Sequence, residues 1–128
     1  MKSPSLHASF RFAFEGLAYA FRTQRNFRIH CFIALVVCGA GVGFGLTATQ
    51  WAIVAAVIGL VFQAELVNTA IEAVTDRASP DLHPLAKVAK DCAAAGVFVS
   101  ALIAVAVGGA VFLPRVIALF QNVWGNVQ

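Results

Sequence analysis

The chain has 128 residues, of which 60% are hydrophobic and only 12% are charged, and its formal net charge is +3 at pH 7. A soluble domain carries about 25% charged residues, so this composition excludes a fold exposed to water on all sides, and a small positive charge without a basic face argues against a nucleic-acid partner. We therefore expect one small, all-α integral membrane domain over residues 1–128.

The first expected element is an amphipathic helix over about residues 5–27. Large apolar side chains recur there at the spacing of one helix face, and charged residues fall on another face. The apolar face comprises Phe10, Phe14, Leu17 and Phe21, and the charged residues are Arg11, Glu15 and Arg22. This pattern suits a helix that lies on the membrane surface. Packing of the apolar face against other helices is the alternative.

Three apolar stretches follow, at about residues 29–46, 51–71 and 92–113. Each is close to the length of about 20 residues that spans a bilayer as a helix. The uncharged link Thr47–Gln50 between the first two is short, which predicts antiparallel neighbours, whereas the charged link over residues 73–90 is the exposed loop. Pro114 is expected to end the third span, because proline disrupts a helix interior.

Basic residues are concentrated before the first span and between the second and third. They are Arg11, Arg22, Arg25, Arg28, Arg77, Lys87 and Lys90. The positive-inside rule therefore predicts a multi-pass protein of the bacterial inner membrane, with a cytoplasmic N-terminus. Arg115 is the exception on the outer side. Trp51 and Trp124 are expected to anchor the outer interface.

Several small motifs carry no predicted chemistry. The three cysteines lack the spacing of a metal site and are read as apolar filler. The stretch Gly39–Gly45, "GAGVGFG", lacks the Gly-Lys-Ser/Thr of a phosphate-binding loop and is expected to serve helix packing. His30, at the entrance of the first span, is assigned to the membrane interface.

The sequence "AELVNTAIEAVTD" interrupts the apolar second span with polar residues on one stripe. Glu65, Asn68, Glu72 and Asp76 fall within an arc of about 80° on a helix. Glu65 would lie about two turns deeper than the interfacial acids, roughly 10 Å in. An acid at such a depth is costly and is a functional-site hypothesis. Hydrogen bonding between helices for specificity is the alternative.

The sequence "KVAKDC" puts three charges at the cytoplasmic start of the third span. Lys90 could neutralise an acid of the stripe or bind phosphate, and Asp91 could cap the helix or ligate a hard cation. Taken alone, Lys87, Lys90 and Asp91 could be ordinary charges at a helix end. Together with the acidic stripe they favour a site for a phosphate ester bound with Mg²⁺, which takes one or two carboxylates plus substrate phosphates.

These two motifs, "ELVNTAIEAVTDR" (Glu65–Arg77) and "AKVAKDCAAAGV" (Ala86–Val97), resemble the prokaryotic diacylglycerol kinases and their undecaprenol kinase relatives. The resemblance extends from about Ser9 to the end of the third span. It implies a homotrimer of three-span subunits with an N-terminal surface helix. It also implies composite active sites that transfer the γ-phosphate of ATP, bound with Mg²⁺, to a lipid hydroxyl.

The resemblance also implies roles for individual residues. Glu65 matches the general base, and Glu72 matches a magnesium ligand. The residues that match organisers of the nucleotide, the metal or the catalytic geometry are Asn68, Asp76, Lys90 and Asp91. Gln24 stands where the best-known members have a second metal-binding Glu, so one metal site is weaker or supplied differently. Arg28, with its neighbours Arg25 and Asn26, is expected either to contact phosphates or to anchor the chain at the interface.

The sequence therefore predicts a lipid kinase that uses ATP and Mg²⁺, with diacylglycerol as the leading acceptor and undecaprenol as the alternative. Both lipids present a primary hydroxyl at the interface, so the sequence does not separate them. Two rivals belong to other classes. One is a small proton-coupled transporter with Glu65 as a carboxyl relay, and the other is a structural subunit of a larger complex.

Overall fold

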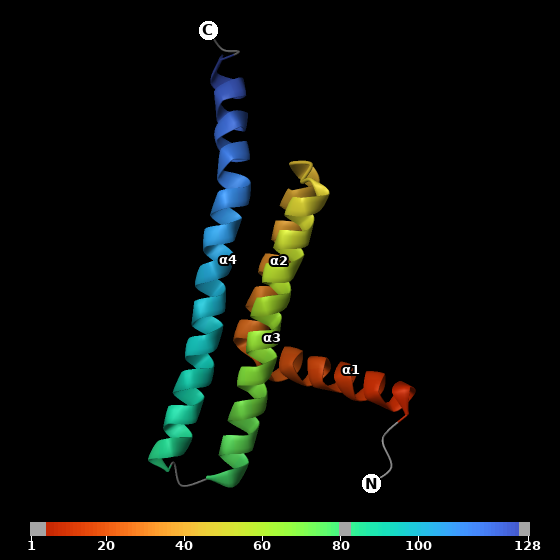
Figure 1. Cartoon of the computed structure of the whole chain (residues 1–128), viewed down its shortest axis with the longest axis vertical. Coiled ribbons are helices and arrows are strands. Elements are labelled where there is room, and N and C mark those ends of the chain that lie inside the picture. The colour runs from red at the N-terminus through yellow and green to blue at the C-terminus, as the bar shows by residue number, and fades with distance from the viewer. Residues whose placement is uncertain (1–4, 80–82, 126–128) are drawn as a thin grey trace.

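The computed structural model describes residues 5–79 and 83–125, and within these ranges the chain forms four α-helices and no strand. They are α1 (Leu6–Thr23), α2 (Arg25–Gly43), α3 (Ala48–Ala78) and α4 (Pro84–Gly125). The last three are long and apolar enough to cross a membrane, which confirms the three predicted spans. Figure 1 shows α2, α3 and α4 running along one another, while α1 projects sideways from them.

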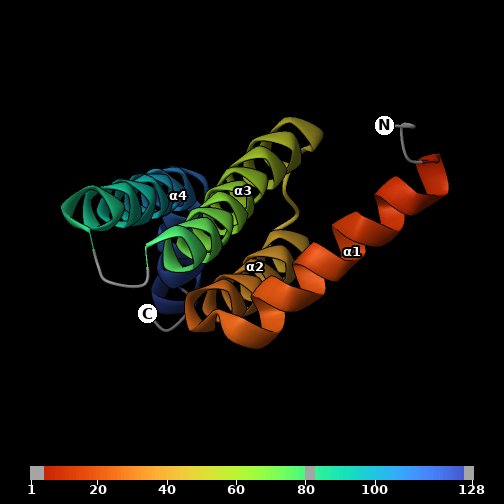
Figure 2. The same ribbon diagram turned by 90° about the horizontal axis from the view of Figure 1, so that it is seen from below.

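Helix α1 keeps its apolar face away from the other three helices. Ser5 caps its start, with its side-chain oxygen accepting a hydrogen bond from the Ala8 amide. Seen from below, α1 extends past the bundle (Figure 2). Its predicted apolar face is 39–68% exposed in the single chain. Of the two sequence-based alternatives, the arrangement favours a helix on the membrane surface over one packed against the spans.

A single residue, Gln24, forms the corner between α1 and α2. Its backbone is extended, with φ −99° and ψ 114°, and its amide donates to the Ala20 carbonyl at 2.8 Å. Arg28 completes this corner, because its guanidinium donates to the carbonyls of Phe21 and Arg22 at 3.2 and 3.1 Å. A cation on the last carbonyls of a helix is favourable. Helix α2 therefore begins at Arg25, four residues earlier than the expected span.

The turn between α2 and α3 is fixed by a Schellman motif. The amide of Gly45 donates to the Val42 carbonyl and that of Leu46 to the Gly41 carbonyl, at 3.2 and 3.1 Å. This ending requires a left-handed residue, and Gly45 has φ 62°. Thr47 then starts α3 with a capping box.

The indole of Trp51 lies over Gly41 in this turn. A Cβ atom at Gly41 would come within 2.7 Å of the indole. Within the glycine-rich stretch, this contact confirms helix packing at one position, whereas Gly39 and Gly43 face open space in the single chain. The side chain of Trp51, expected at the outer interface, is half-buried against α2 in this turn. The side chain of Trp124 lies outside the described residues.

Helix α4 does not stop at Pro114. It begins at Pro84 and continues to Gly125, so the expected span of about 92–113 is extended at both ends and the predicted stop is wrong. Proline is tolerated inside membrane helices. The next residue, Arg115, donates to the Val111 carbonyl at 2.7 Å and to the Gln50 side chain on α3 at 2.6 Å. This bridge gives the one outer basic residue a structural role.

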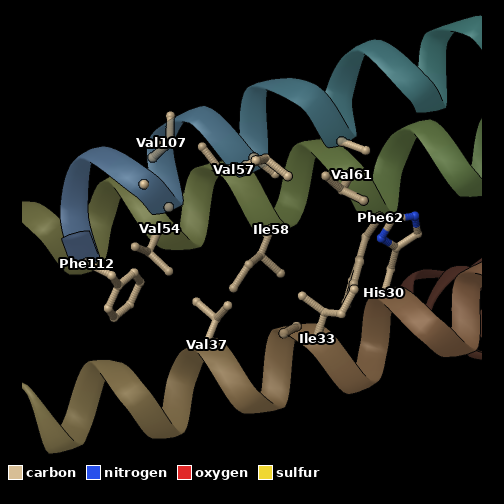
Figure 3. Close-up of a pocket in the computed structure, with 16 residues that line it drawn as sticks. His30, Ile33, Val37, Val54, Val57, Ile58, Val61, Phe62, Val107 and Phe112 are labelled. Atoms are coloured by element: carbon tan, nitrogen blue, oxygen red, sulfur yellow. The ribbon is translucent and has the colours of Figure 1, made fainter. Parts of the chain in front are cut away.

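Helix α3 is the centre of the domain, and α2 and α4 lie on either side of it. The closest packing joins α3 and α4, around a small core of Leu46, Val54 and Val111. Between α2, α3 and α4 remains a cavity of about 390 Å³. Figure 3 shows its apolar walls, with Phe112 at one end and His30 at the other. His30 is the only polar side chain among the described residues that line it.

Candidate active site

The predicted polar stripe runs along α3 and becomes more exposed toward the C-terminal end of that helix. Glu65 is 2% exposed and Asn68 is 9% exposed, whereas Glu72 is half-buried and Asp76 is exposed. The stripe therefore runs from the interior of the bundle to its surface. Such a gradient allows one end to meet a water-soluble group and the other to meet a lipid.

Glu72 connects the stripe with the corner between α1 and α2. The Asn68 side-chain amide donates to Glu72 Oε1 at 3.1 Å, and the Gln24 side-chain amide donates to Glu72 Oε2 at 3.2 Å. Two donors on one carboxyl group suit its ionised form, which only accepts hydrogen bonds. The structure thus brings together three of the predicted site residues, including Gln24, which is 48 positions away from Glu72 in the sequence.

Glu65 lies deeper, against a histidine that the sequence reasoning missed. His30 Nε2 is 3.4 Å from Glu65 Oε1, and the two side chains are 20% and 3% exposed. His30, assigned from the sequence to the membrane interface, faces the interior of the bundle here and lies about as far along α2 from Gln24 as Glu65 lies along α3 from Glu72. The spacing in the sequence could have indicated this contact. His30 follows Gln24 by six residues and Glu65 precedes Glu72 by seven, so the two side chains lie at similar distances from the contact between Gln24 and Glu72.

Two buried oxygen atoms of the stripe have no hydrogen-bond partner among the described residues. They are Glu65 Oε1 and Asn68 Oδ1. His30 Nε2 lies within ion-pair distance of Glu65 Oε1, but the two groups are not aligned for a hydrogen bond. An unsatisfied buried polar atom costs about 1–3 kcal/mol. In a native structure such an atom is explained by an ordered water or ion, by strain, or by a catalytic role.

Lys90 joins the stripe from α4. Its ammonium group lies 2.8 Å from Asp76 Oδ1, so the two longest helices are linked at the charged end of the bundle. Asp76 lies on the same stripe of α3 as Glu65. Its ion pair with Lys90 therefore puts Lys90 on the same side of the bundle as Glu65. The prediction that α3 and α4 contribute polar groups to a common site agrees with this geometry.

Two predicted site residues are not brought to the stripe in the single chain. Asp91 pairs with Lys87, and both side chains are largely exposed. Because α4 begins at Pro84, Asp91 cannot be its cap; His83 instead accepts the Leu85 amide at 3.2 Å. Arg28 is engaged with the end of α1, so the alternative in which it contacts phosphates is not supported by its position.

The chain matches the family model described as prokaryotic diacylglycerol kinase over residues 11–112. A diacylglycerol kinase of Synechocystis is 47% identical over 118 residues, which cover 91% of this chain and 67% of that protein. The undecaprenol kinase of Bacillus subtilis is 42% identical over 107 residues, covering 84% and 87%. A diacylglycerol kinase of Haemophilus influenzae is 31% identical over 105 residues, covering 81% and 89%.

Proposed function

Since the chain belongs to the prokaryotic diacylglycerol kinase family and is a multi-pass membrane lipid kinase, we propose that it transfers the γ-phosphate of ATP to the hydroxyl of diacylglycerol. Undecaprenol is the alternative acceptor, because a relative of similar identity is an undecaprenol kinase. The observation that carries the proposal is the graded stripe of Glu65, Glu72 and Asp76, joined at its outer end by Lys90.

The depths of these residues along the membrane normal support a reaction between a water-soluble nucleotide and a lipid. Gln24 ends the surface helix and contacts Glu72, so Glu72 lies near the level of the membrane surface. Asp76 and Lys90 then lie about 6 Å farther out, and Glu65 lies about 10 Å deeper, at 1.5 Å per residue of helix. A triphosphate would approach the outer part from water. A lipid hydroxyl would approach the inner part, beside the apolar cavity.

Glu65 is proposed as the general base. Its Oε1 atom retains a free lone pair and can accept the proton of the acceptor hydroxyl. The hydroxyl oxygen then forms a bond to the γ-phosphorus while the bond from that phosphorus to the β,γ-bridging oxygen breaks, and ADP leaves with the electron pair. Phosphoryl transfer depends mainly on position and charge neutralisation, so it requires no covalent enzyme intermediate.

Mg²⁺ is proposed to bind at Glu72, with Gln24 as the neighbouring ligand. The available donors, one carboxylate and the oxygen of a rotated side-chain amide, are the hard oxygen ligands that Mg²⁺ accepts alongside substrate phosphates. When bound, the ion would neutralise charge on the transferring phosphoryl group. Asn68 holds the Glu72 carboxylate in place.

Lys90 is proposed to contact the nucleotide phosphates, with Asp76 orienting its ammonium group. We assign no role in this chemistry to Asp91 and Arg28, which the single chain places away from the stripe.

The membrane orientation and the assembly are part of the same proposal. Basic residues gather where α1 meets α2 and where α3 approaches α4, which supports a cytoplasmic N-terminus in the bacterial inner membrane. Glu72 is only half-buried and Asp76 is exposed, so a neighbouring subunit of a homotrimer could complete the enclosure of the nucleotide. Chemical cross-linking of the purified, active protein in micelles tests this. Cross-linked trimers are expected, and an active protein that cross-links to no species larger than a monomer would contradict the assembly.

The acceptor is tested with purified protein, γ-labelled ATP and each lipid in separate mixed micelles. Labelled phosphatidic acid, formed faster than labelled undecaprenyl phosphate, is the expected result. The reverse ratio would assign the chain to the alternative acceptor. The Glu65→Gln variant is the control for contaminating kinases and should form neither product. Absence of both products with the unmodified protein would refute the proposed function.

A further inference from the structure

A deeply buried carboxylate that accepts a proton must also be able to release it. Glu65 is 2% exposed, so its carboxyl group has little direct access to water. Glu72 and Asp76, on the outer turns of the same helix, have clearer access. After each turnover under the proposed function, a protonated Glu65 would therefore need a neighbouring group to carry its proton away.

His30 is the titratable side chain that touches Glu65. Its Nε2 atom is 3.4 Å from Glu65 Oε1, and its side chain is more exposed than that of Glu65, at 20% against 3%. The imidazole also lines the apolar cavity, at the end opposite Phe112 (Figure 3). His30 thus lies between the buried oxygen of Glu65 and the cavity.

The other charged groups near Glu65 are less suitable for this task. Glu72 lies on the same helix and its two oxygens already accept hydrogen bonds from side-chain amides. Lys90, farther out on α4, is held by Asp76. An imidazole is also the side chain whose ordinary titration falls between about pH 5 and 8.

We propose that His30 is a positioning residue for the general base: it aligns the Glu65 carboxylate and takes up the proton from Glu65 after the γ-phosphate has been transferred to the lipid hydroxyl. This inference rests on the proposed function. Neutral imidazole accepts the proton at Nε2, which regenerates the Glu65 carboxylate and forms an imidazolium ion. The imidazolium then releases one proton to water. No oxidant, reductant or further co-substrate is required.

The first test compares the unmodified protein with His30→Gln, which retains a polar side chain but does not titrate. We expect kcat to fall on the order of 100-fold with the KM for ATP within about twofold. The acidic limb of the kcat profile between about pH 5 and 8 should disappear. His7→Gln, which removes an exposed histidine from α1, is the matched control and should keep the full profile.

Two kinetic results would overturn the proposal. One is an unchanged kcat and pH profile in His30→Gln. The other is a reduced kcat with the acidic limb intact, which would identify His30 as a packing residue only.

The second test does not depend on kinase activity. Histidine-selective NMR of the full chain in micelles records the imidazole signals of His30, with His30→Gln identifying them. In Glu65→Gln, the chemical shifts of His30 should change while those of His7 and His83 stay in place, because His30 lies 3.4 Å from the replaced carboxyl group. Unchanged His30 signals would overturn the pairing. Inactivity toward both lipids with changed His30 signals would refute the kinase assignment alone.

Discussion

Replacing Gln24 by Glu tests whether the corner between α1 and α2 is part of a metal site. In the structure the Gln24 amide donates to Glu72 Oε2 at 3.2 Å. The substitution removes this hydrogen bond and puts a second carboxylate beside the first. Without a cation the variant should be destabilised, whereas Mg²⁺ should bind between two carboxylates better than beside one.

The magnitude follows from the distance. Two unit charges 3.2 Å apart repel by about 1 kcal/mol in bulk water and about 5 kcal/mol at an effective dielectric constant of 20. Glu72 is half-buried and both side chains can rotate apart, so the effect should lie near the lower of these two values. We therefore expect the free energy of unfolding of the variant to fall by about 1–2 kcal/mol when EDTA removes the metal. Relief of a repulsion of this size corresponds to a gain of about tenfold in Mg²⁺ affinity.

The assay is thermal unfolding of the purified variant in EDTA and in a Mg²⁺ series without nucleotide, followed by kinase activity at saturating ATP against free Mg²⁺. Gln24→Glu should melt earlier than the unmodified protein in EDTA and recover with Mg²⁺, and its half-saturating Mg²⁺ concentration should fall. Gln121→Glu adds the same charge at an exposed position near the far end of α4 and is the control. Equal Mg²⁺ responses in both variants would refute the metal assignment.

The other predictions concern the stripe and the outer turn. Glu65→Gln should lower kcat by at least about 100-fold while calorimetry shows ATP affinity within about twofold, because a base acts in the chemical step; a lost affinity would contradict this role. Glu72→Gln should raise the Mg²⁺ concentration needed for half-maximal rate, and an unchanged titration would remove it from the metal site. Lys90→Met should raise the KM for ATP by about tenfold through loss of a phosphate contact, and an unchanged KM would exclude that contact. Gly41→Ala should destabilise the domain by about 1 kcal/mol in thermal unfolding, because its new methyl group collides with Trp51; Trp51→Leu in the same chain should restore stability.

The sequence predicted the three spans and the polar stripe because both depend on periodicity within one segment. Apolar runs of bilayer length predict spans, and polar residues three or four positions apart must share a helix face. The spacing of Glu65 and Asp76 within one helix is therefore enough to predict that their side chains share a stripe. Periodicity within one segment does not predict the pairing of Lys90 with that stripe. The pairing also requires the start of α4 to lie beside the end of α3.

The features that sequence reasoning missed depend on how one helix is rotated against another. His30 faces Glu65 only because α2 begins at Arg25 and presents its second turn to α3. Arg115, which follows Pro114 in α4, donates to Gln50 at the start of α3, and the sequence of α4 alone does not reveal that partner. Local rules describe a proline or a histidine in isolation, and they carry no information on the partner that a distant segment supplies.

The absence of a linker at Gln24 makes the site sensitive to the thickness of the bilayer. Helix α2 has 19 residues and is about 28 Å long, which leaves little slack across a hydrocarbon layer of about 30 Å. A thicker or thinner membrane changes the tilt of such a segment, and the hinge residue at its end carries a side chain that touches Glu72. If Glu72 holds the metal as proposed, we expect the rate of phosphate transfer to depend on lipid chain length through the Gln24 side-chain amide.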